Sequence, residues 1–341
     1  MVTNKETGLY TLINKNGMRV DLTNYGARAI AIVVPDNMGN LVDVILGYDN
    51  ISGYLSSNDY YSGATIGRYA NRISGGKFTL DGIEYILAIN DTCGPNNLHG
   101  GISGFSHKVW HTRILDDNGI EFSYRSADLE EGFPGNLDVL VTYRLTEDNA
   151  LNIDYIAVTD KPTVCNLTHH SYFNLHGAGE GTILDHVLQI MADQYTPIDE
   201  AQLPISGNIP VWGTPFDFNT PCAIGSRLKT VYQQLIIGNG YNHNFVLNAH
   251  ENNQPIAVVW SPVTGIKMEM FTDEPGVQFY SCGLLERKNS GKRGTKYINN
   301  GAFCLEAQHY PDSPNHPAFP STRLDPGKKY TQLTSYRFSI K

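Results

Sequence analysis

The sequence predicts an all-β fold, a large antiparallel β-sandwich, and three observations carry this prediction. Short runs in which polar and apolar residues alternate recur along the chain, and they are rich in β-branched and aromatic side chains. Turn signals such as NKNG, PDNMGN, DDNG and GFPGN separate these runs at short intervals. Long amphipathic helical patterns are scarce and no GxGxxG motif follows a strand, which disfavours a doubly wound nucleotide-binding fold.

The expected strands are, in chain order, GLYTLIN (8–14), KFTLDGIEYILAI (77–89), LDVLVTYRL (137–145), ALNIDYIAV (150–158) and HNFVLN (243–248). The first is a short alternating run, and the second contains the turn signal LDG, so it predicts a hairpin. The next two alternate over their full length, and the last is short and apolar at its centre. In the fourth run, alternation gathers four mostly apolar side chains on one face: Leu151, Ile153, Tyr155 and Ala157.

The chain of 341 residues is predicted to be one domain that spans residues 1–341. Hydrophobic residues make up 41% and charged residues 17%, a balance that can support a sizeable core and disfavours disorder. No internal repeat indicates a solenoid or propeller. The Pro-rich segment 191–221 is expected to be an ordered loop, because it carries Trp212, Phe216 and Phe218.

Charge and cysteine content exclude several classes of function. The formal net charge of -9 argues against nucleic-acid binding, which needs a basic surface. The five cysteines are scattered, without a close pair, so neither a disulfide framework nor a CxxC site is indicated. The first residues lack the apolar stretch of a signal peptide, and no run approaches the ~18 apolar residues of a membrane span. We therefore expect a cytoplasmic protein that binds no membrane.

Two adjacent histidines stand in NLTHHSYFNL, residues 166–175. If this stretch is a β-strand, its side chains alternate between two faces. His170 then shares a polar face with Tyr172 and Asn174, whereas His169 faces a mostly apolar side. The pattern makes His170 the candidate for chemistry and predicts that His169 packs in the interior.

Glu306 lies in the run GAFCLEAQHY, which begins at residue 301 and reads as a strand. An acidic residue within an apolar strand is costly to bury, and an unpaired buried carboxyl shifts its pKa toward the neutral form. Two ordinary explanations stay open at this point: a glutamate at a strand edge in solvent, or a structural ion pair.

Two further segments contain hydrogen-bond donors: GRYANRISGG contributes Arg68, Asn71 and Arg72, and NNLHGG contributes His99. For the first segment, the alternative to a binding site is a surface turn with two solvated arginines. For His99, it is a loop histidine that caps backbone groups. The eleven histidines include no HxxxH pair on an expected helix, so we expect no metal site, and no GxSxG motif indicates a serine nucleophile. What remains is acid–base chemistry by histidine and glutamate on a polar substrate.

Five separated motifs, in order along the chain, resemble the galactose mutarotases, also called aldose 1-epimerases: GRYANRI, LHGG, THHSYFNL, PGVQFY and LEAQHYPDSPNHPAFP. The similarity runs from about residue 10 to the end. It implies a single-domain β-supersandwich and no cofactor. The implied activity interconverts the α and β anomers of free hexoses, galactose and glucose above all, so the expected partner is a monosaccharide.

The same resemblance implies roles for individual residues. Glu306 matches the general base, which takes the proton from the C1 hydroxyl, and His170 matches the general acid, which protonates the ring oxygen. Four further positions match sugar contacts: Asn71, Arg72, His99 and Gln278.

The sequence departs from the family pattern at two positions. Asn242 stands where the family usually has an aspartate that binds sugar hydroxyls, and Gly283 stands where an asparagine is common. An amide lacks the charge that strengthens such hydrogen bonds, so we expect weaker sugar binding or an altered hydroxyl preference. The alternatives are a non-catalytic carbohydrate-binding homologue, an epimerase for another sugar or sugar phosphate, and a glycoside hydrolase, which needs two carboxylates. A monomer or a homodimer is expected.

Overall fold

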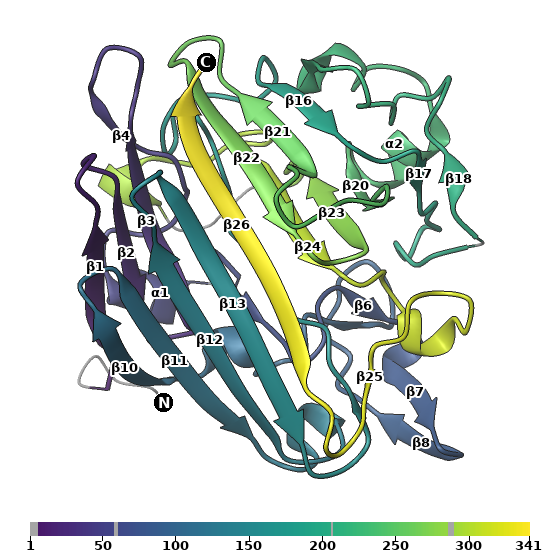
Figure 1. Cartoon of the computed structure of the whole chain (residues 1–341). Coiled ribbons are helices and arrows are strands. Elements are labelled where there is room, and N and C mark those ends of the chain that lie inside the picture. The colour runs from purple at the N-terminus through teal and green to yellow at the C-terminus, as the bar shows by residue number, and fades with distance from the viewer. Residues whose placement is uncertain (1–5, 58–60, 206, 286–289) are drawn as a thin grey trace.

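A computed structural model describes residues 6–57, 61–205, 207–285 and 290–341, and strands dominate them. The largest element is a nine-stranded antiparallel sheet that crosses the whole molecule (Figure 1). Its strands are, in spatial order, β10 (His111–Asp116), β11 (Gly119–Ser126), β12 (Leu137–Leu145), β13 (Ala150–Thr159), β26 (Tyr330–Ile340), β22 (Ile266–Thr272), β21 (Ala257–Trp260), β16 (Val187–Ile190) and β19 (Cys222–Ala223).

Two smaller antiparallel sheets complete the main framework. A four-stranded sheet contains β1 (Leu9–Ile13), β2 (Arg19–Thr23), β3 (Arg28–Pro35) and β4 (Leu41–Asp43). A five-stranded sheet has the order β18 (Ile209–Pro210), β17 (Gln194–Tyr195), β20 (Asn242–Val246), β23 (Gly276–Tyr280) and β24 (Cys304–Gln308).

Short strand pairs and helical turns connect these sheets. The pairs are β14 (Thr163–Val164) with β25 (Arg323–Leu324), β15 (Thr168–His169) with β5 (Thr65–Ile66), β6 (Arg72–Ile73) with β9 (Asn97–Leu98), and β7 (Lys77–Leu80) with β8 (Ile83–Ile86). The α-helices of the described residues are α1 (Ile51–Ser56) and α2 (Gln233–Ile237). Single 3₁₀ turns span Ser74–Gly76, Phe105–His107, Glu130–Gly132, Ile224–Ser226, Lys292–Gly294 and Ser313–Asn315.

The core lies between the nine-stranded sheet and the two smaller sheets. Tyr10 of β1 packs against Phe122 of β11, with ring centroids 6.0 Å apart. On the other side, the Tyr336 hydroxyl of β26 donates to the carbonyl oxygen of Leu305 in β24 at 3.1 Å. One contiguous cluster of buried apolar residues joins all three sheets. The predicted all-β sandwich is therefore confirmed.

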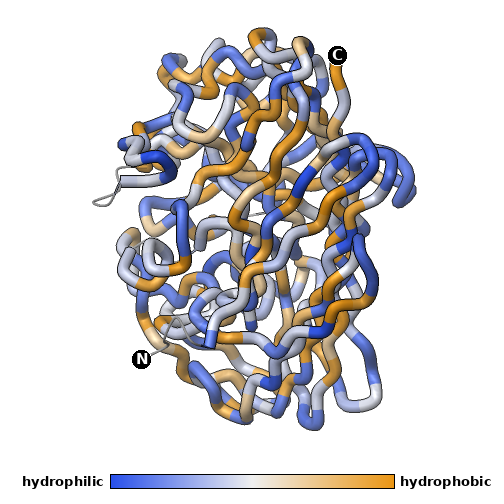
Figure 2. Tube along the Cα trace, turned by 90° about the vertical axis from the view of Figure 1, so that its left-hand side faces the viewer, coloured by the Kyte–Doolittle hydropathy of each residue, from blue (hydrophilic) through white to orange (hydrophobic). Residues whose placement is uncertain are grey.

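Alternation along the strands explains why they form this core. Leu151, Ile153, Tyr155 and Ala157 of β13 are all buried, as the pattern predicts, and their neighbours on the other face are partly or fully exposed. Residues 77–89 form the expected hairpin of β7 and β8. Figure 2 shows hydrophobic stretches along the strands of the interior and hydrophilic stretches at many turns. No helix in the described part of the chain has the length and apolar character that a bilayer crossing requires.

Two sequence-based interpretations need correction. Residues 166–175 are not one strand, because β15 ends at His169, and Asn174 turns away to donate to the carbonyl oxygen of Gly301 at 3.0 Å. Arg68 is buried rather than solvated, and its guanidinium satisfies backbone carbonyls, among them that of Pro134 at 2.7 Å. In the segment 191–221, Phe216 and Phe218 are buried and Trp212 is 60% exposed; Ser206 lies outside the described residues.

Candidate active site

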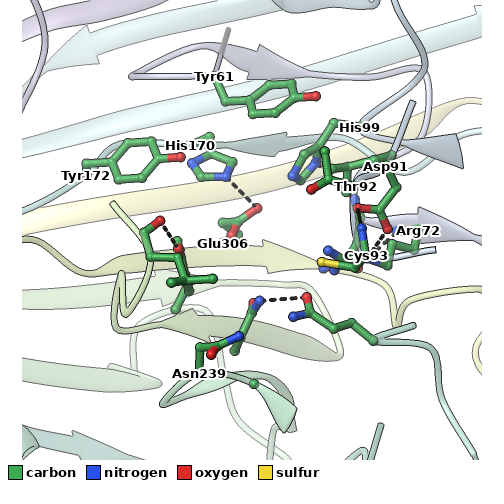
Figure 3. Close-up of a pocket in the computed structure, with 17 residues that line it drawn as sticks. Tyr61, Arg72, Asp91, Thr92, Cys93, His99, His170, Tyr172, Asn239 and Glu306 are labelled. Atoms are coloured by element: carbon green, nitrogen blue, oxygen red, sulfur yellow. Dashed lines mark hydrogen bonds and ion pairs between the residues drawn. The ribbon is translucent and has the colours of Figure 1, made fainter. Parts of the chain in front are cut away.

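A cavity of about 240 Å³ lies where β24 and the start of β20 meet loops from distant parts of the chain. Figure 3 shows Tyr61, His99 and His170 on one side of it, Asn239 on the opposite side, and Glu306 between them. The volume is below the ~300–1,000 Å³ of drug-sized pockets, so it suits a small polar ligand.

Glu306 sits in the middle of β24, paired with Gln278 of β23. Because strand side chains alternate, Leu305 and Ala307 enter the core while Glu306 points to the cavity. Its side chain is only 4% exposed. Burial raises the pKa of the Glu306 carboxyl to about 8, and the charge of Arg72 offsets this only in part. Of the two ordinary explanations, a solvated strand-edge glutamate is therefore wrong.

His170 follows β15 directly and faces Glu306. Its Nε2 atom lies 3.6 Å from Oε2 of Glu306, and both side chains are almost fully buried. The imidazole stacks on Tyr172 with ring centroids 4.8 Å apart and on Tyr61 at 5.8 Å. These two ring contacts restrict the orientation of the imidazole plane.

His169 points the other way, into the core, as the sequence predicts. Its Nε2 is 2.7 Å from the Ser171 hydroxyl, and its ring packs between Tyr143 and Tyr336. Burial lowers the pKa of His169 to about 3, so it stays neutral. The two adjacent histidines thus have separate surroundings, although the strand that should separate them is only two residues long.

His99 and Asn71 form a backbone-anchored pair at the cavity. The backbone N–H of Asn71 donates to Nδ1 of His99 at 3.2 Å, and the N–H of His99 donates to the Asn71 carbonyl oxygen at 3.0 Å. Both residues have left-handed backbones, with φ of 63° and 53°. Since burial lowers the pKa of His99 well below its usual value, the ring is neutral and its Nε2 carries the hydrogen. His99 is therefore a hydrogen-bond donor to the cavity.

Arg72 is held in place by Asp91, which sequence analysis missed. Nε of Arg72 donates to Oδ2 of Asp91 at 2.8 Å, and the side chain of Asp91 is 1% exposed. Burial opposes ionisation of Asp91, but Arg72 and Asn96 outweigh it and lower its pKa. The ion pair uses the Nε side of the guanidinium, so the remaining Arg72 donors are available to the cavity. No motif marked Asp91, since its partner lies 19 positions away.

Amide groups form the opposite side of the cavity, and we call Gln202, Asn239 and Asn242 the amide wall. The Asn242 Nδ2 donates to Oε1 of Gln202 at 3.0 Å, and its Oδ1 accepts from Nε2 of Gln278 at 2.9 Å. Gln278 thus lies behind Asn242 and is 3% exposed, rather than on the cavity wall. Gln202 and Asn239 were not found from the sequence, because both occupy irregular loops without a strand pattern.

The glycine at position 283 allows Asn239 to approach. A Cβ atom on Gly283 would lie 1.7 Å from the carbonyl oxygen of Asn239, a contact that no side chain can make. Asn239 itself has a left-handed backbone with φ of 51° between two glycines. The departure at position 283 therefore sets how closely this loop packs, an effect the sequence alone did not reveal.

Two groups in the described residues bring three potential metal ligands within 4.8 Å of one another: His99, His170 and Glu306, and His176, Asp185 and His186. In the second, Nε2 of His186 accepts the backbone N–H of Leu175 at 2.9 Å, so Nδ1 carries the hydrogen and cannot coordinate a metal. In the first, Nδ1 of His99 accepts the backbone N–H of Asn71, so Nε2 carries the hydrogen and cannot coordinate a metal. Each group therefore lacks one of its three potential ligands.

Comparison of the sequence with known families gives one match over nearly the whole chain. The family described as Aldose 1-epimerase matches residues 8–337. The galactose mutarotase of Bos taurus is 42% identical over 328 residues, which cover 96% of this chain and 93% of the relative. The aldose 1-epimerase of Escherichia coli (strain K12) is 39% identical over 334 residues, which cover 97% and 94%.

Solved structures share the fold. A GalM/aldose epimerase homologue from C. elegans superposes with a TM-score of 0.89 at 28% identity, over 98% of this chain and 99% of the other. The galactose 1-epimerase from Lactobacillus acidophilus NCFM gives a TM-score of 0.83 at 28% identity, over 98% of both chains. The similarity therefore extends over the whole framework that carries the cavity.

Proposed function

The chain belongs to the aldose 1-epimerase family of isomerases, and on this premise we propose that it interconverts the α and β anomers of free aldohexoses such as galactose and glucose. Glu306 acts as the general base and His170 as the general acid. The observation that carries this proposal is the 3.6 Å separation of Nε2 of His170 from Oε2 of Glu306 inside a small polar cavity.

The short separation suits the chemistry of a hemiacetal. Ring opening removes a proton from the C1 hydroxyl and adds a proton to the ring oxygen, and both oxygens are bonded to the same carbon. An acid and a base that serve them together must be near neighbours. His170 and Glu306 meet this condition although they lie far apart in the sequence.

The proton balance closes over the whole reaction. Glu306 takes the proton from the C1 hydroxyl while protonated His170 gives one to the ring oxygen, which opens the ring to the aldehyde. The C1–C2 bond then rotates and presents the other carbonyl face to the C5 hydroxyl. On closure, Glu306 returns its proton to the carbonyl oxygen and His170 takes one from the attacking hydroxyl, so the enzyme regains its starting state.

One proton shared by the pair is sufficient for this cycle. Burial raises the pKa of Glu306 to about 8, which favours the neutral acid before substrate binds. Carboxylate with imidazolium contains the same number of protons as carboxylic acid with neutral imidazole, so the reactive form needs only a proton shift within the pair. The Nε2–H of His99 and the free Arg72 donors are available to hold the sugar and its developing charge.

The geometry disfavours the hydrolase alternative. A glycosidase needs two carboxyl groups roughly 5 to 10 Å apart, each free to act on the substrate. Among the described residues that line the cavity, the second carboxylate belongs to Asp91, which is bound to Arg72 and Asn96. Asp91 is therefore occupied in orienting other side chains.

Polarimetry of freshly dissolved α-D-galactose tests the proposal. The protein should speed relaxation to an unchanged final rotation, and Glu306→Gln or His170→Asn should each slow this by ~10² to 10⁴-fold. Gln254→Glu, at an exposed turn, is a control variant. Unchanged relaxation with measurable galactose binding would instead identify a carbohydrate-binding homologue. Full activity in Glu306→Gln would refute the assigned base.

A further inference from the structure

Gln202 occupies an unusual position for its residue type. Its backbone is left-handed, with φ of 58°, although its side chain has a Cβ that disfavours this region. The N–H of Gln202 donates to the Asp199 carbonyl oxygen at 2.8 Å, and the N–H of Leu203 donates to Oδ1 of Asp199 at 2.9 Å. This tight turn directs the side chain into the cavity, where the residue is 7% exposed.

A second contact ties the turn to the arginine side of the cavity. Asn96 is fully buried, and its Nδ2 donates both to the carbonyl oxygen of Ala201 and to Oδ2 of Asp91, each at 3.0 Å. Asp91 in turn holds Arg72. The turn that carries Gln202 is thus bound directly to the Asn96 amide, and the guanidinium of Arg72 is linked to the same amide through Asp91.

The direction of the hydrogen bonds determines what the amide wall presents. Asn242 gives one N–H to Oε1 of Gln202, and its oxygen accepts from Gln278. The second N–H of Asn242 remains, and the described hydrogen bonds give Nε2 of Gln202 no acceptor. Both groups are donors. Without Gln202, only the bond from Gln278 would hold the Asn242 amide in this orientation.

We propose that Gln202 is a substrate-positioning residue, which acts by fixing the Asn242 amide so that this side of the cavity offers N–H donors to a sugar hydroxyl oxygen. The inference rests on the proposed function, since it concerns the same cavity. Gln202 should affect substrate binding rather than the chemical step, because the positions of Glu306 and His170, which lie on other segments, are not set by Gln202. The two oxygens of a carboxylate are equivalent, so an aspartate at position 242 would leave Gln202 no amide orientation to fix.

Three variants test the inference through KM and kcat for α-D-galactose and through calorimetric Kd. Gln202→Met keeps the side-chain length but removes the amide oxygen and the amide NH2. KM and Kd should therefore rise about 5- to 10-fold, with kcat within about twofold. Gln202→Glu still has an oxygen that accepts from Asn242, so KM should stay within about twofold. Gln254→Met is the matched control, at an exposed glutamine whose Oε1 accepts a hydrogen bond from the backbone N–H of Glu251. If Gln202→Met does not fold, Gln202→Ala takes its place.

The outcomes separate this inference from the proposed function. Unchanged KM and Kd in Gln202→Met, or a loss confined to kcat, would overturn it. Equal damage in Gln202→Glu would also overturn it, because the donor of Gln202 itself would then contact the sugar. A wild-type protein that binds galactose without catalysis would refute the proposed function while the Kd series still decides on Gln202. Absence of both binding and catalysis would refute the two together.

Discussion

Replacing Glu306 with glutamine should stabilise the fold increasingly as the pH rises, at the cost of activity. The folded protein holds the Glu306 proton with a pKa of about 8, whereas the reference value of a glutamate is 4.5. The fold therefore binds this proton more tightly than the unfolded chain does. Its contribution to stability is complete below about pH 4.5 and is lost as the pH rises through about 8.

The magnitude follows from linkage. A pKa difference between about 8 and 4.5, at ~1.36 kcal/mol per unit, amounts to a total loss of about 5 kcal/mol. Integrated between pH 5 and pH 7, the wild type loses about 2 to 3 kcal/mol through this group. Glutamine cannot ionise, so the stability of Glu306→Gln relative to the wild type should increase by that amount over the same interval.

Urea unfolding at fixed temperature at pH 5, 6, 7 and 8 measures this difference. Titrating groups that do not interact with Glu306 contribute equally in both proteins, so they cancel in the comparison of the two pH profiles. Glu251→Gln makes the same chemical change at an exposed position and should show no comparable increase. A constant difference between Glu306→Gln and the wild type across this pH range would refute the reasoning, because it would mean that the carboxyl is solvated in the folded protein.

Three further predictions concern activity. The kcat/KM for galactose should pass through a maximum and fall above about pH 8, because the pair of Glu306 and His170 then loses its shared proton; a continued tenfold rise per unit above pH 8 would contradict this. Asn242→Asp should lower the KM for galactose about threefold or more, because the stronger hydrogen bonds that a carboxylate accepts from sugar hydroxyls outweigh the loss of the Asn242 N–H donor; an unchanged KM would contradict this. Gly283→Asn should displace the loop of Asn239 and raise KM several-fold at similar kcat, measured by polarimetry, whereas wild-type kinetics would show that the loop position is unimportant.

Alternation along strands explains why the catalytic candidates could be predicted. Glu306 and the core residues beside it occupy a regular strand, so a period of two separates the cavity side from the core side. The same alternation predicts the split between His169 and His170, although β15 ends at His169 and His170 lies just after it. Two donor-rich segments named Asn71, Arg72 and His99 as candidates and the family resemblance matched them to sugar contacts; the structure brings all three to the same cavity.

Residues held by long-range contacts could not be predicted in this way. Arg68 and Arg72 occur in the same short motif, but Arg68 ends among the carbonyls of a distant loop while Arg72 meets Asp91. Gln202 approaches Asn242 from 40 positions away, in a turn whose left-handed backbone no sequence pattern signals for a glutamine. Pairings of this kind depend on how the loops fold over the sheets, which local periodicity does not contain.

The left-handed backbones around the cavity limit how this protein can be stabilised. Asn71, His99, Gln202 and Asn239 each have a positive φ, and such residues cost of order 1 kcal/mol or more apiece relative to glycine. An engineer who seeks higher Tm would substitute glycine at such sites, yet here each substitution removes a side chain that lines the cavity. Gains in thermal stability should therefore be sought elsewhere, for example at the exposed hydrophobic positions of the outer strands and turns.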